Sequence, residues 1–165
     1  MNESTQLLQK YATERSEEAF SLLVSRYVNL VFSVARRQAN KDSHLAQDIT
    51  QTVFADLAEK ADSIPPETQL GGWLHRRTCH VASTIRRSDK RRQRREDTAM
   101  AIESSHSNDD SSWDTLAPDL DLAINRLCDS DRTAIVMRFF EERNHRDIGI
   151  ALQTTEDTAQ KRVMR

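Results

Sequence analysis

The sequence predicts an all-α protein built from two small helical domains that are joined by an acidic, flexible linker. Three observations support this prediction. Glycine and proline, which interrupt helices, each occur only three times among 165 residues. No stretch alternates Val, Ile, Thr and aromatic residues as a half-buried strand would. Apolar residues instead recur at intervals of three and four, the spacing that places them on one face of a helix.

The composition also limits the class of protein. The net charge is −2 at pH 7, and the longest apolar runs are far shorter than the ~20 residues that span a bilayer. No charged start followed by an apolar run marks a signal peptide. We therefore expect a cytoplasmic protein without membrane insertion. Cys79 and Cys128 are too few and too far apart for a disulfide framework, so two reduced thiols are expected.

Two helices are expected at the N-terminal end, the first over residues 4–14. Ser16 is placed to cap the second helix. Glu17 and Glu18 put negative charge in its first turn, where the helix dipole favours it. The stripe of this helix that should face the core consists of Phe20, Leu23, Val24, Tyr27, Leu30, Val31 and Val34.

A third helix is expected from a cap at Asp42 or Ser43 to about Lys60. Its apolar stripe consists of Leu45, Ile49, Val53, Phe54 and Leu57. Residues three or four apart lie on the same face of a helix. Three polar residues with this spacing are therefore expected to form a ridge separate from the apolar stripe. This polar ridge consists of Asp48, Gln51 and Thr52.

A strongly basic segment follows, from Gly71 to Arg95. Between Arg76 and Arg95 it carries nine Lys and Arg residues against one acid, Asp89. Like charges four residues apart repel each other on a helix, so this density predicts an external polyanion, in the first instance nucleic acid. The pair Gly71-Gly72 is expected to allow a tight start to this helix. Its buried side should consist of Trp73, Leu74, Cys79 or Thr78, Val81, Ala82 and Ile85.

Residues 96–118 have the composition of an acidic linker. From Glu96 to Asp121 there are eight acids and no Lys or Arg, which is too polar to pack. We place the first domain at residues 1–95 and the second at 119–165. Linker composition favours domains that move independently. Acidity beside a basic helix also suggests weak autoinhibition, although ordinary linker chemistry is the simpler explanation.

The second domain is expected to contain three or four short helices. The caps are Asp129 or Ser130, then Asn144, then Thr155, and the apolar set of the first capped helix includes Ile135, Val136, Phe139 and Phe140. Two short helices joined by a short turn, the second polar on one face, describe a helix-turn-helix. The side chains expected to reach bases and phosphates are Thr158, Gln160, Lys161 and Arg165, flanked by Thr155 and Arg162.

The order of these parts resembles the extracytoplasmic-function (ECF) sigma factors of bacterial RNA polymerase, within the sigma-70 superfamily. The first half is similar to the family's −10-binding domain, with Phe20, Leu23 and Tyr27 as its F-x-x-L-x-x-x-Y, and Ala46, Asp48, Gln51 and Phe54 in its acidic-aromatic box. Trp73-Leu74 matches its "W-L" helix start and Arg86-Arg87 its terminal arginines. The second half resembles the −35-binding domain through Leu127 to Arg132, Asp147-Ile148-Gly149 and the last helix.

The resemblance implies a protein that is not an enzyme, needs no cofactor or metal, and binds core RNA polymerase through its largest and β subunits as well as promoter DNA. It implies a possible anti-sigma partner. Polymerase binding would fall to Asp48, Gln51 and Thr52. The −10 element would be held by Ser63, His80, Arg86, Arg87, Lys90 and Arg91, and the −35 element by Thr155, Thr158, Gln160, Lys161, Arg162 and Arg165.

Three positions depart from the family pattern. Gln47 replaces the usual acid of the polymerase-binding box, and His80 stands where the family usually has Asn. Gln153 occupies a turn position where glycine is often found. The chain stops at Arg165, within the expected recognition helix, so the −35 domain is expected to be cut short.

Other functions remain open from the residues. A helix-turn-helix regulator would bind duplex DNA without polymerase. A helical adaptor would use the basic helix to bind an acidic protein. A metal site at His75, Cys79 and His80 lacks the second cluster that zinc sites usually have. No Gly-rich phosphate loop or nucleophile elbow supports an enzyme.

Overall fold

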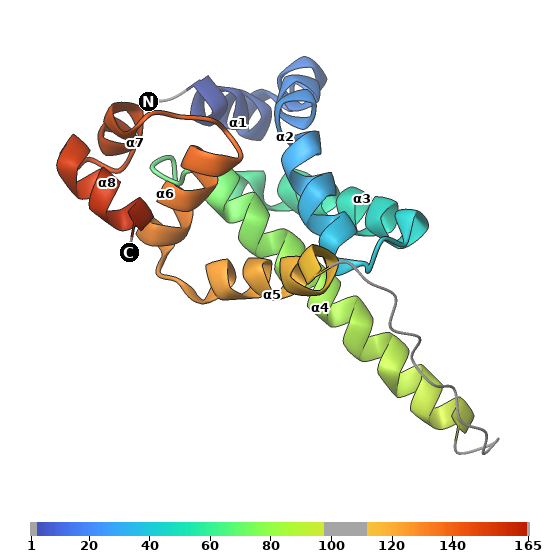
Figure 1. The fold of residues 1–165 in the computed structure, drawn as a ribbon. Coiled ribbons are helices and arrows are strands. Elements are labelled where there is room, and N and C mark those ends of the chain that lie inside the picture. The colour runs from blue at the N-terminus through green and yellow to red at the C-terminus, as the bar shows by residue number, and fades with distance from the viewer. Residues whose placement is uncertain (1–2, 98–111, 165) are drawn as a thin grey trace.

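The computed structural model describes residues 3–97 and 112–164, apart from the side chains of residues 89–97, 112–115, 117 and 118. This part of the chain is all-helical, which confirms the predicted class. The elements are α1 (Glu3–Glu14), α2 (Glu17–Gln38), α3 (Ser43–Lys60), the 3-10 helix η1 (Ala61–Ser63), α4 (Leu70–Asp97), α5 (Ser112–Arg126), α6 (Asp129–Phe139), α7 (His145–Ala151) and α8 (Glu156–Met164) (Figure 1).

Helix α2 is the central helix of the first half and packs against α1, α3 and α4. Its expected core residues Leu23, Val31 and Val34 are fully buried. The cap is also confirmed, since the Ser16 hydroxyl accepts a hydrogen bond from the Ala19 N–H at 3.3 Å. By length and composition alone α2 could cross a membrane. Its most apolar face packs into the core of the protein, so its length and composition are only weak evidence for a membrane span.

Helix α3 is capped by Asp42, the first of the two expected residues. One carboxylate oxygen of Asp42 accepts hydrogen bonds from the N–H groups of His44 and Leu45, both at 3.0 Å. The stripe of α3 packs into the same core as α2, with Val53 and Leu57 fully buried. Opposite this stripe, the helix presents its polar ridge to solvent.

Helix α4 spans both the core and the basic segment. Its N-terminal half is buried among α2, α3 and the second half of the chain, and Figure 1 shows its C-terminal turns extending away from the bundle. Leu74, Cys79, Val81 and Ala82 are buried as expected, and so is His75, which was not expected in the core. The helix therefore serves as a packing element first and projects its basic end from the fold.

Helices α6, α7 and α8 surround a small second core. Its fully or largely buried members are Ala134, Met137, Ile148 and Ala159. Asn144 caps α7 by accepting from the Asp147 N–H at 2.8 Å, and Thr155 caps α8 by accepting from the Thr158 N–H at 3.2 Å. Gln153 has φ 54° in the turn between these helices, the left-handed backbone that explains why glycine is common at such a position.

Three details of the second half differ from the sequence expectations. Helix α5 begins at Ser112, inside the stretch expected to be linker, while residues 98–111 lie outside the described residues. Helix α6 begins at Asp129, so the cap position is Cys128 rather than the expected Asp129 or Ser130, and Cys128 makes no side-chain cap. Phe139 was expected to face the core but is 66% exposed, because α6 ends there and the chain turns away.

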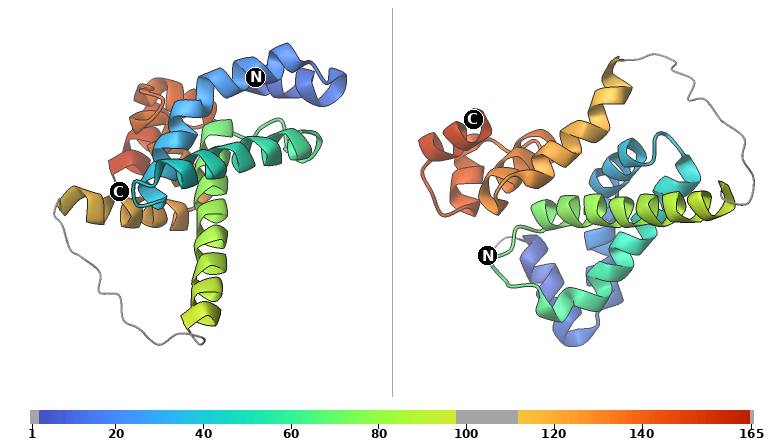
Figure 2. Two further views of the ribbon diagram at one scale, coloured as in Figure 1. Left: turned by 90° about the vertical axis from the view of Figure 1, so that its right-hand side faces the viewer. Right: turned by 90° about the horizontal axis from the view of Figure 1, so that it is seen from below.

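The two halves of the chain pack against each other through contacts of α4 with α6 and of α5 with α2 and α4. Figure 2 shows α5–α8 gathered beside the N-terminal half of α4. Gly71 and Gly72 lie where α6 comes nearest. A Cβ at Gly71 would collide with the Glu141 carboxylate, and one at Gly72 would lie 2.5 Å from the Thr133 hydroxyl oxygen. Neither glycine has a positive φ, so the pair permits close helix packing rather than a tight start to α4.

Candidate functional site

The polar ridge of α3 is accessible. Asp48, Gln51 and Thr52 are all exposed. The Thr52 hydroxyl donates to the Asp48 carbonyl at 2.8 Å, which keeps this side chain close to the helix backbone. The carboxylate of Asp48 and the amide of Gln51 therefore present the polar groups of the ridge to a binding partner.

A second exposed region is the η1 turn and the loop that leads to α4. The Ser63 hydroxyl donates to the Lys60 carbonyl at 2.9 Å, and Arg15, which follows α1, forms an ion pair with Asp62 at 2.6 Å. His80 is also exposed, on the outer face of α4. Between Ser63 and His80, however, the chain contacts the second half. The amide of Gln69 donates to the Ala151 carbonyl at 3.1 Å.

The arginines of α4 divide into anchored and projecting side chains. Arg77 pairs with Asp56 of α3 at 2.6 Å. Arg86 donates at 2.8 Å to the side-chain oxygen of Gln38, which is fully buried. Arg87 is exposed and donates within its own helix to the carbonyl and the hydroxyl of Ser83. The side chains of Lys90 and Arg91 lie outside the described residues, although the helical backbone continues through both.

The outer face of α8 carries the residues expected to read DNA. Gln160 and Lys161 are exposed, and Lys161 pairs with Asp157 one turn away at 2.7 Å. Thr155 is occupied with capping. Arg162 forms an ion pair with Asp131 of α6 at 2.6 Å, so in this structure it anchors α8 to α6. Arg165 lies outside the described residues.

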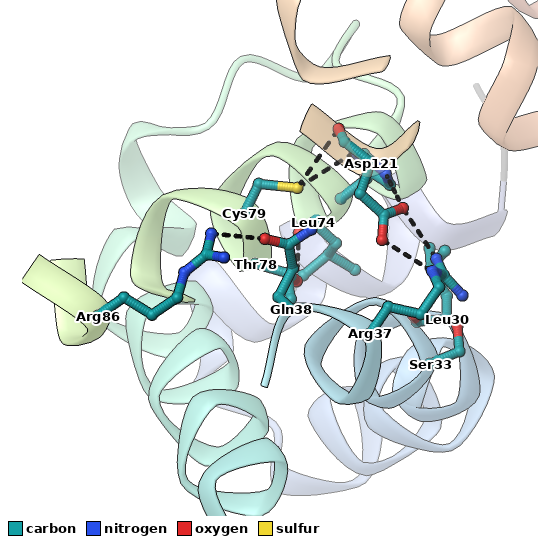
Figure 3. Close-up of polar contacts among 10 residues, drawn as sticks. Leu30, Ser33, Arg37, Gln38, Leu74, Thr78, Cys79, Arg86 and Asp121 are labelled. Atoms are coloured by element: carbon teal, nitrogen blue, oxygen red, sulfur yellow. Dashed lines mark hydrogen bonds and ion pairs between the residues drawn. The ribbon is translucent and has the colours of Figure 1, made fainter. Parts of the chain in front are cut away.

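A buried polar cluster was missed by the sequence reasoning. Asp121 of α5 is fully buried between α2 and α4. Arg37 donates to its two carboxylate oxygens at 2.8 and 2.9 Å, and His75 Nε2 lies 3.2 Å from one of them. The Cys79 thiol points at the Asp121 carbonyl at 3.8 Å (Figure 3). In the sequence Asp121 resembles the other acids of the polar stretch that precedes it. Its contacts with Arg37 of α2 and His75 of α4 are what distinguish it from them.

Burial and hydrogen bonding set the charge states in this cluster. Burial raises the pKa of the Cys79 thiol to about 12, with the Asp121 carboxylate as a further cause. Burial also acts to raise the pKa of Asp121, but the hydrogen bonds from His75 and Arg37 outweigh it and hold that pKa below its ordinary value. Asp121 is therefore an anion paired with Arg37, and Cys79 is a neutral, protected thiol.

The arrangement does not bring together the metal ligands considered from the sequence. His75 and Cys79 are buried beside each other, with Nδ1 and Sγ 4.0 Å apart, whereas His80 is exposed. No group of three His, Cys, Asp or Glu side chains among the described residues could hold a metal ion.

The geometry thus combines an exposed acidic-polar ridge, a helix with a basic end and a polar face on a terminal two-helix unit. Residues 23–93 match the family model Sigma-70 region 2. The matched stretch comprises most of α2, all of α3 and η1, and α4 through Gln93. The family that this model describes acts in transcription initiation as a sigma factor of RNA polymerase and is not catalytic. No curated protein matches the chain.

Proposed function

We propose that this protein is a cytoplasmic sigma factor of the ECF type, which binds bacterial core RNA polymerase and directs it to promoters with a −35 and a −10 element. Residues 1–95 form region 2, residues 119–165 form a region 4 helix-turn-helix, and the acidic stretch 96–118 connects them. The observation that carries the proposal is the occurrence, in one chain, of a region 2 match followed by α7 and α8, a short helix pair whose second helix exposes Gln160 and Lys161.

The polymerase-binding surface is assigned to Asp48, Gln51 and Thr52. The three residues are exposed on the outer face of a helix whose opposite face is firmly packed. A ridge on such a rigid support keeps its shape in the free protein, so binding requires little reordering. The largest subunit of the polymerase is the expected partner, with the β subunit as a second one.

The −10 element is assigned to Ser63, His80 and the arginines of α4. Ser63 and His80 are exposed, whereas Leu74 and His75 between them are buried in the core. Arg86 and Arg87 lie at the point where α4 leaves the bundle, with Lys90 and Arg91 on the following turn. Each phosphate that such cations neutralise releases counterions, so this contact should be strongly salt-dependent.

The −35 element is assigned to α8. Thr158, Gln160 and Lys161 provide hydroxyl, amide and ammonium groups, which suit base edges and phosphates in a major groove. Arg162 can contribute to DNA binding only after it leaves Asp131. Thr155 can contribute only after its capping bond to the Thr158 N–H is broken. Arg165 completes the assigned set.

In vitro transcription tests the proposal. The purified protein is added to bacterial core polymerase on genomic DNA fragments, and transcript starts are mapped. Starts that share upstream −10 and −35 sequences are expected, and they should disappear when Asp48→Arg prevents polymerase binding. Binding of duplex DNA without any polymerase-dependent start would instead identify a helix-turn-helix regulator. Absence of salt-dependent DNA affinity would identify a protein-binding adaptor.

A further inference from the structure

The residue that follows α1 has a backbone conformation that its side chain does not favour. Arg15 has φ 52°, in the left-handed region where glycine is the usual residue after a helix. Its N–H donates to the Tyr11 carbonyl at 2.9 Å, which closes the last turn of α1. Glycine would form the same turn at a lower conformational cost, so the arginine indicates that the side chain has a use at this position.

The side chain of Arg15 connects the end of α1 to the η1 turn. Its guanidinium carbon lies 5.5 Å from the centre of the Tyr11 ring, and Tyr11 packs against Phe20 of α2 with ring centres 4.7 Å apart. One guanidinium nitrogen donates to the Asp62 carboxylate at 2.6 Å. The cation is therefore supported by an aromatic pair while it holds an acid 47 residues further along the chain.

The acid that Arg15 holds lies at the start of a loop. Ser63 follows Asp62 in the chain, and the loop that leads to α4 comes next. The side chain of Ile64 is partly buried against the core, whereas residues 65–67 are exposed. Exposed loops are more mobile than the helices that they connect. An ion pair at the first residues of this loop therefore limits the positions that Ser63 and the residues after it can take.

We propose that Arg15 is a positioning residue for −10 recognition, which fixes the start of the loop through Asp62 and so determines how strictly the −10 sequence is discriminated. Helix α1 thereby takes part in promoter selection without itself contacting DNA. Both side chains of the ion pair are more than half exposed, and exposed pairs are weak, so the effect on discrimination is up to about fivefold. This inference rests on the proposed assignment of Ser63 to the −10 contact.

The first experiment compares Arg15→Gly with wild type in transcription by bacterial core polymerase on a promoter library that is randomised in the −10 element. Glycine adopts the left-handed backbone freely. This relief offsets the lost side-chain contacts, so the variant should melt close to the wild-type temperature. The ratio of transcription between preferred and substituted −10 sequences should fall by up to about fivefold. Polymerase binding should be unchanged, because the polar ridge lies on α3.

Lys10→Ala is the matched control, since it removes the same charge from an exposed position of α1 and leaves Arg15 in place. This variant should discriminate −10 sequences as wild type does. Unchanged discrimination in Arg15→Gly, or an equal fall in Lys10→Ala, would overturn the proposal. A uniform loss of transcription on all −10 sequences, with the ratio preserved, would also overturn it, because Arg15 would then contribute charge to DNA binding and not position.

The second experiment reverses the ion pair and does not depend on the behaviour of Arg15→Gly. Arg15→Asp places two carboxylates against each other, and aspartate tolerates the left-handed backbone. This variant should lose at least as much discrimination as Arg15→Gly. Adding Asp62→Arg restores an ion pair of opposite polarity and should recover most of the loss. Full discrimination in Arg15→Asp, or a double variant that discriminates no better than Arg15→Asp, would contradict the positioning role.

The wild-type protein separates this inference from the proposed function. If wild type supports no transcription from any promoter of the library, the proposed sigma function itself is wrong. If wild type is active and discriminates between −10 sequences, but the Arg15 variants discriminate equally well, the sigma function stands and the role of Arg15 is wrong.

Discussion

The two halves of this protein differ in how much of their stability they supply themselves. The first half buries a continuous stripe from each of its long helices, including Leu23, Ile49 and Leu57, in one core. Among the described residues, the core of the second half consists of buried Ala134, Met137, Ile148 and Ala159, with Ala151, Leu152 and Val163 partly buried against it. Val136 and Phe140 of the second half pack into the core of the first half. A unit this small rarely has enough core to be stable alone. The comparison indicates that α6–α8 depend on their packing against α4 for stability.

The largest effect is expected from truncating a core side chain. The two halves should differ in how much of the chain unfolds when their own core is truncated. Leu57→Ala and Ile148→Ala each remove a fully buried side chain and should cost about 2–5 kcal/mol of unfolding free energy. Leu57→Ala should destabilise the whole chain, whereas Ile148→Ala should release α6–α8 and leave α1–α4 folded. Residue-resolved hydrogen exchange measures this. Undiminished protection of α6–α8 in Leu57→Ala would contradict the dependence described above.

A smaller effect is expected from disturbing the helix contact between the halves. Gly71→Val places a branched side chain against Glu141 and Val136, and such overpacking should cost about 1–3 kcal/mol. Protease cleavage in α6–α8 should accelerate while α1–α3 stay protected. Thr84→Val, on the exposed face of the same helix, is the matched control. Similar cleavage rates in both variants would mean that the α4–α6 contact does not hold the second half.

The charge cluster gives the comparison a pH dependence. The pKa of Asp121 is below its ordinary value in the folded protein. Its contribution is therefore fully present above the ordinary carboxyl pKa and is lost as pH falls through the lowered folded value. The stability difference between wild type and Asp121→Asn should be constant near neutral pH and shrink in acid. Chemical denaturation at a series of pH values measures it. A difference that shrinks as pH rises would contradict the pairing with Arg37.

Glu141 should behave in the opposite sense. Burial at the same interface raises the pKa of its carboxyl group, so its ionised form opposes folding at neutral pH and protonation relieves this cost as pH falls. Glu141→Gln should therefore be at least as stable as wild type near neutral pH. The same titration with this variant provides an internal check on the sign for Asp121.

The smallest effect is expected from a single helix cap. Asn144→Ala removes the side chain that accepts from the Asp147 N–H and should cost about 0.5–2 kcal/mol. Because α7 has only seven residues, the loss should appear as local fraying of α7, seen as faster hydrogen exchange there. Asn144→Asp, which keeps an accepting oxygen, should behave like wild type. Slower exchange or no change in Asn144→Ala would argue that the cap is not stabilising.

Much of the local structure could be predicted from the sequence, because it depends on residues near one another in the chain. Ser16, Asn144 and Thr155 cap the helices that they were expected to cap, and the apolar stripes of α2 and α3 face the core. The errors also have local causes. Phe139 fits the periodicity of α6 but lies at its end, where the chain turns away.

The exposure of the candidate site residues was predictable where they lie on one helix. The spacing of Asp48, Gln51 and Thr52 on α3 places them on one exposed face. The spacing of Gln160 and Lys161 likewise places them on the exposed face of α8. The roles of Arg86 and Arg162 were not predictable, because their partners Gln38 and Asp131 come from other helices. An arginine on a basic or polar face looks available for DNA until the acceptor that holds it is known.

The sequence by itself determined the helices, their caps and the resemblance to a sigma factor, since periodicity and motif spacing are properties of short stretches. Only the tertiary structure decided that Asp121 is a buried anion rather than one acid among eight, and that Gly71 and Gly72 serve close packing. Arg37 and Asp121 are 84 residues apart. Their pairing depends on how α2, α4 and α5 pack in three dimensions, and no pattern in a short stretch of sequence predicts a contact between residues so far apart in the chain.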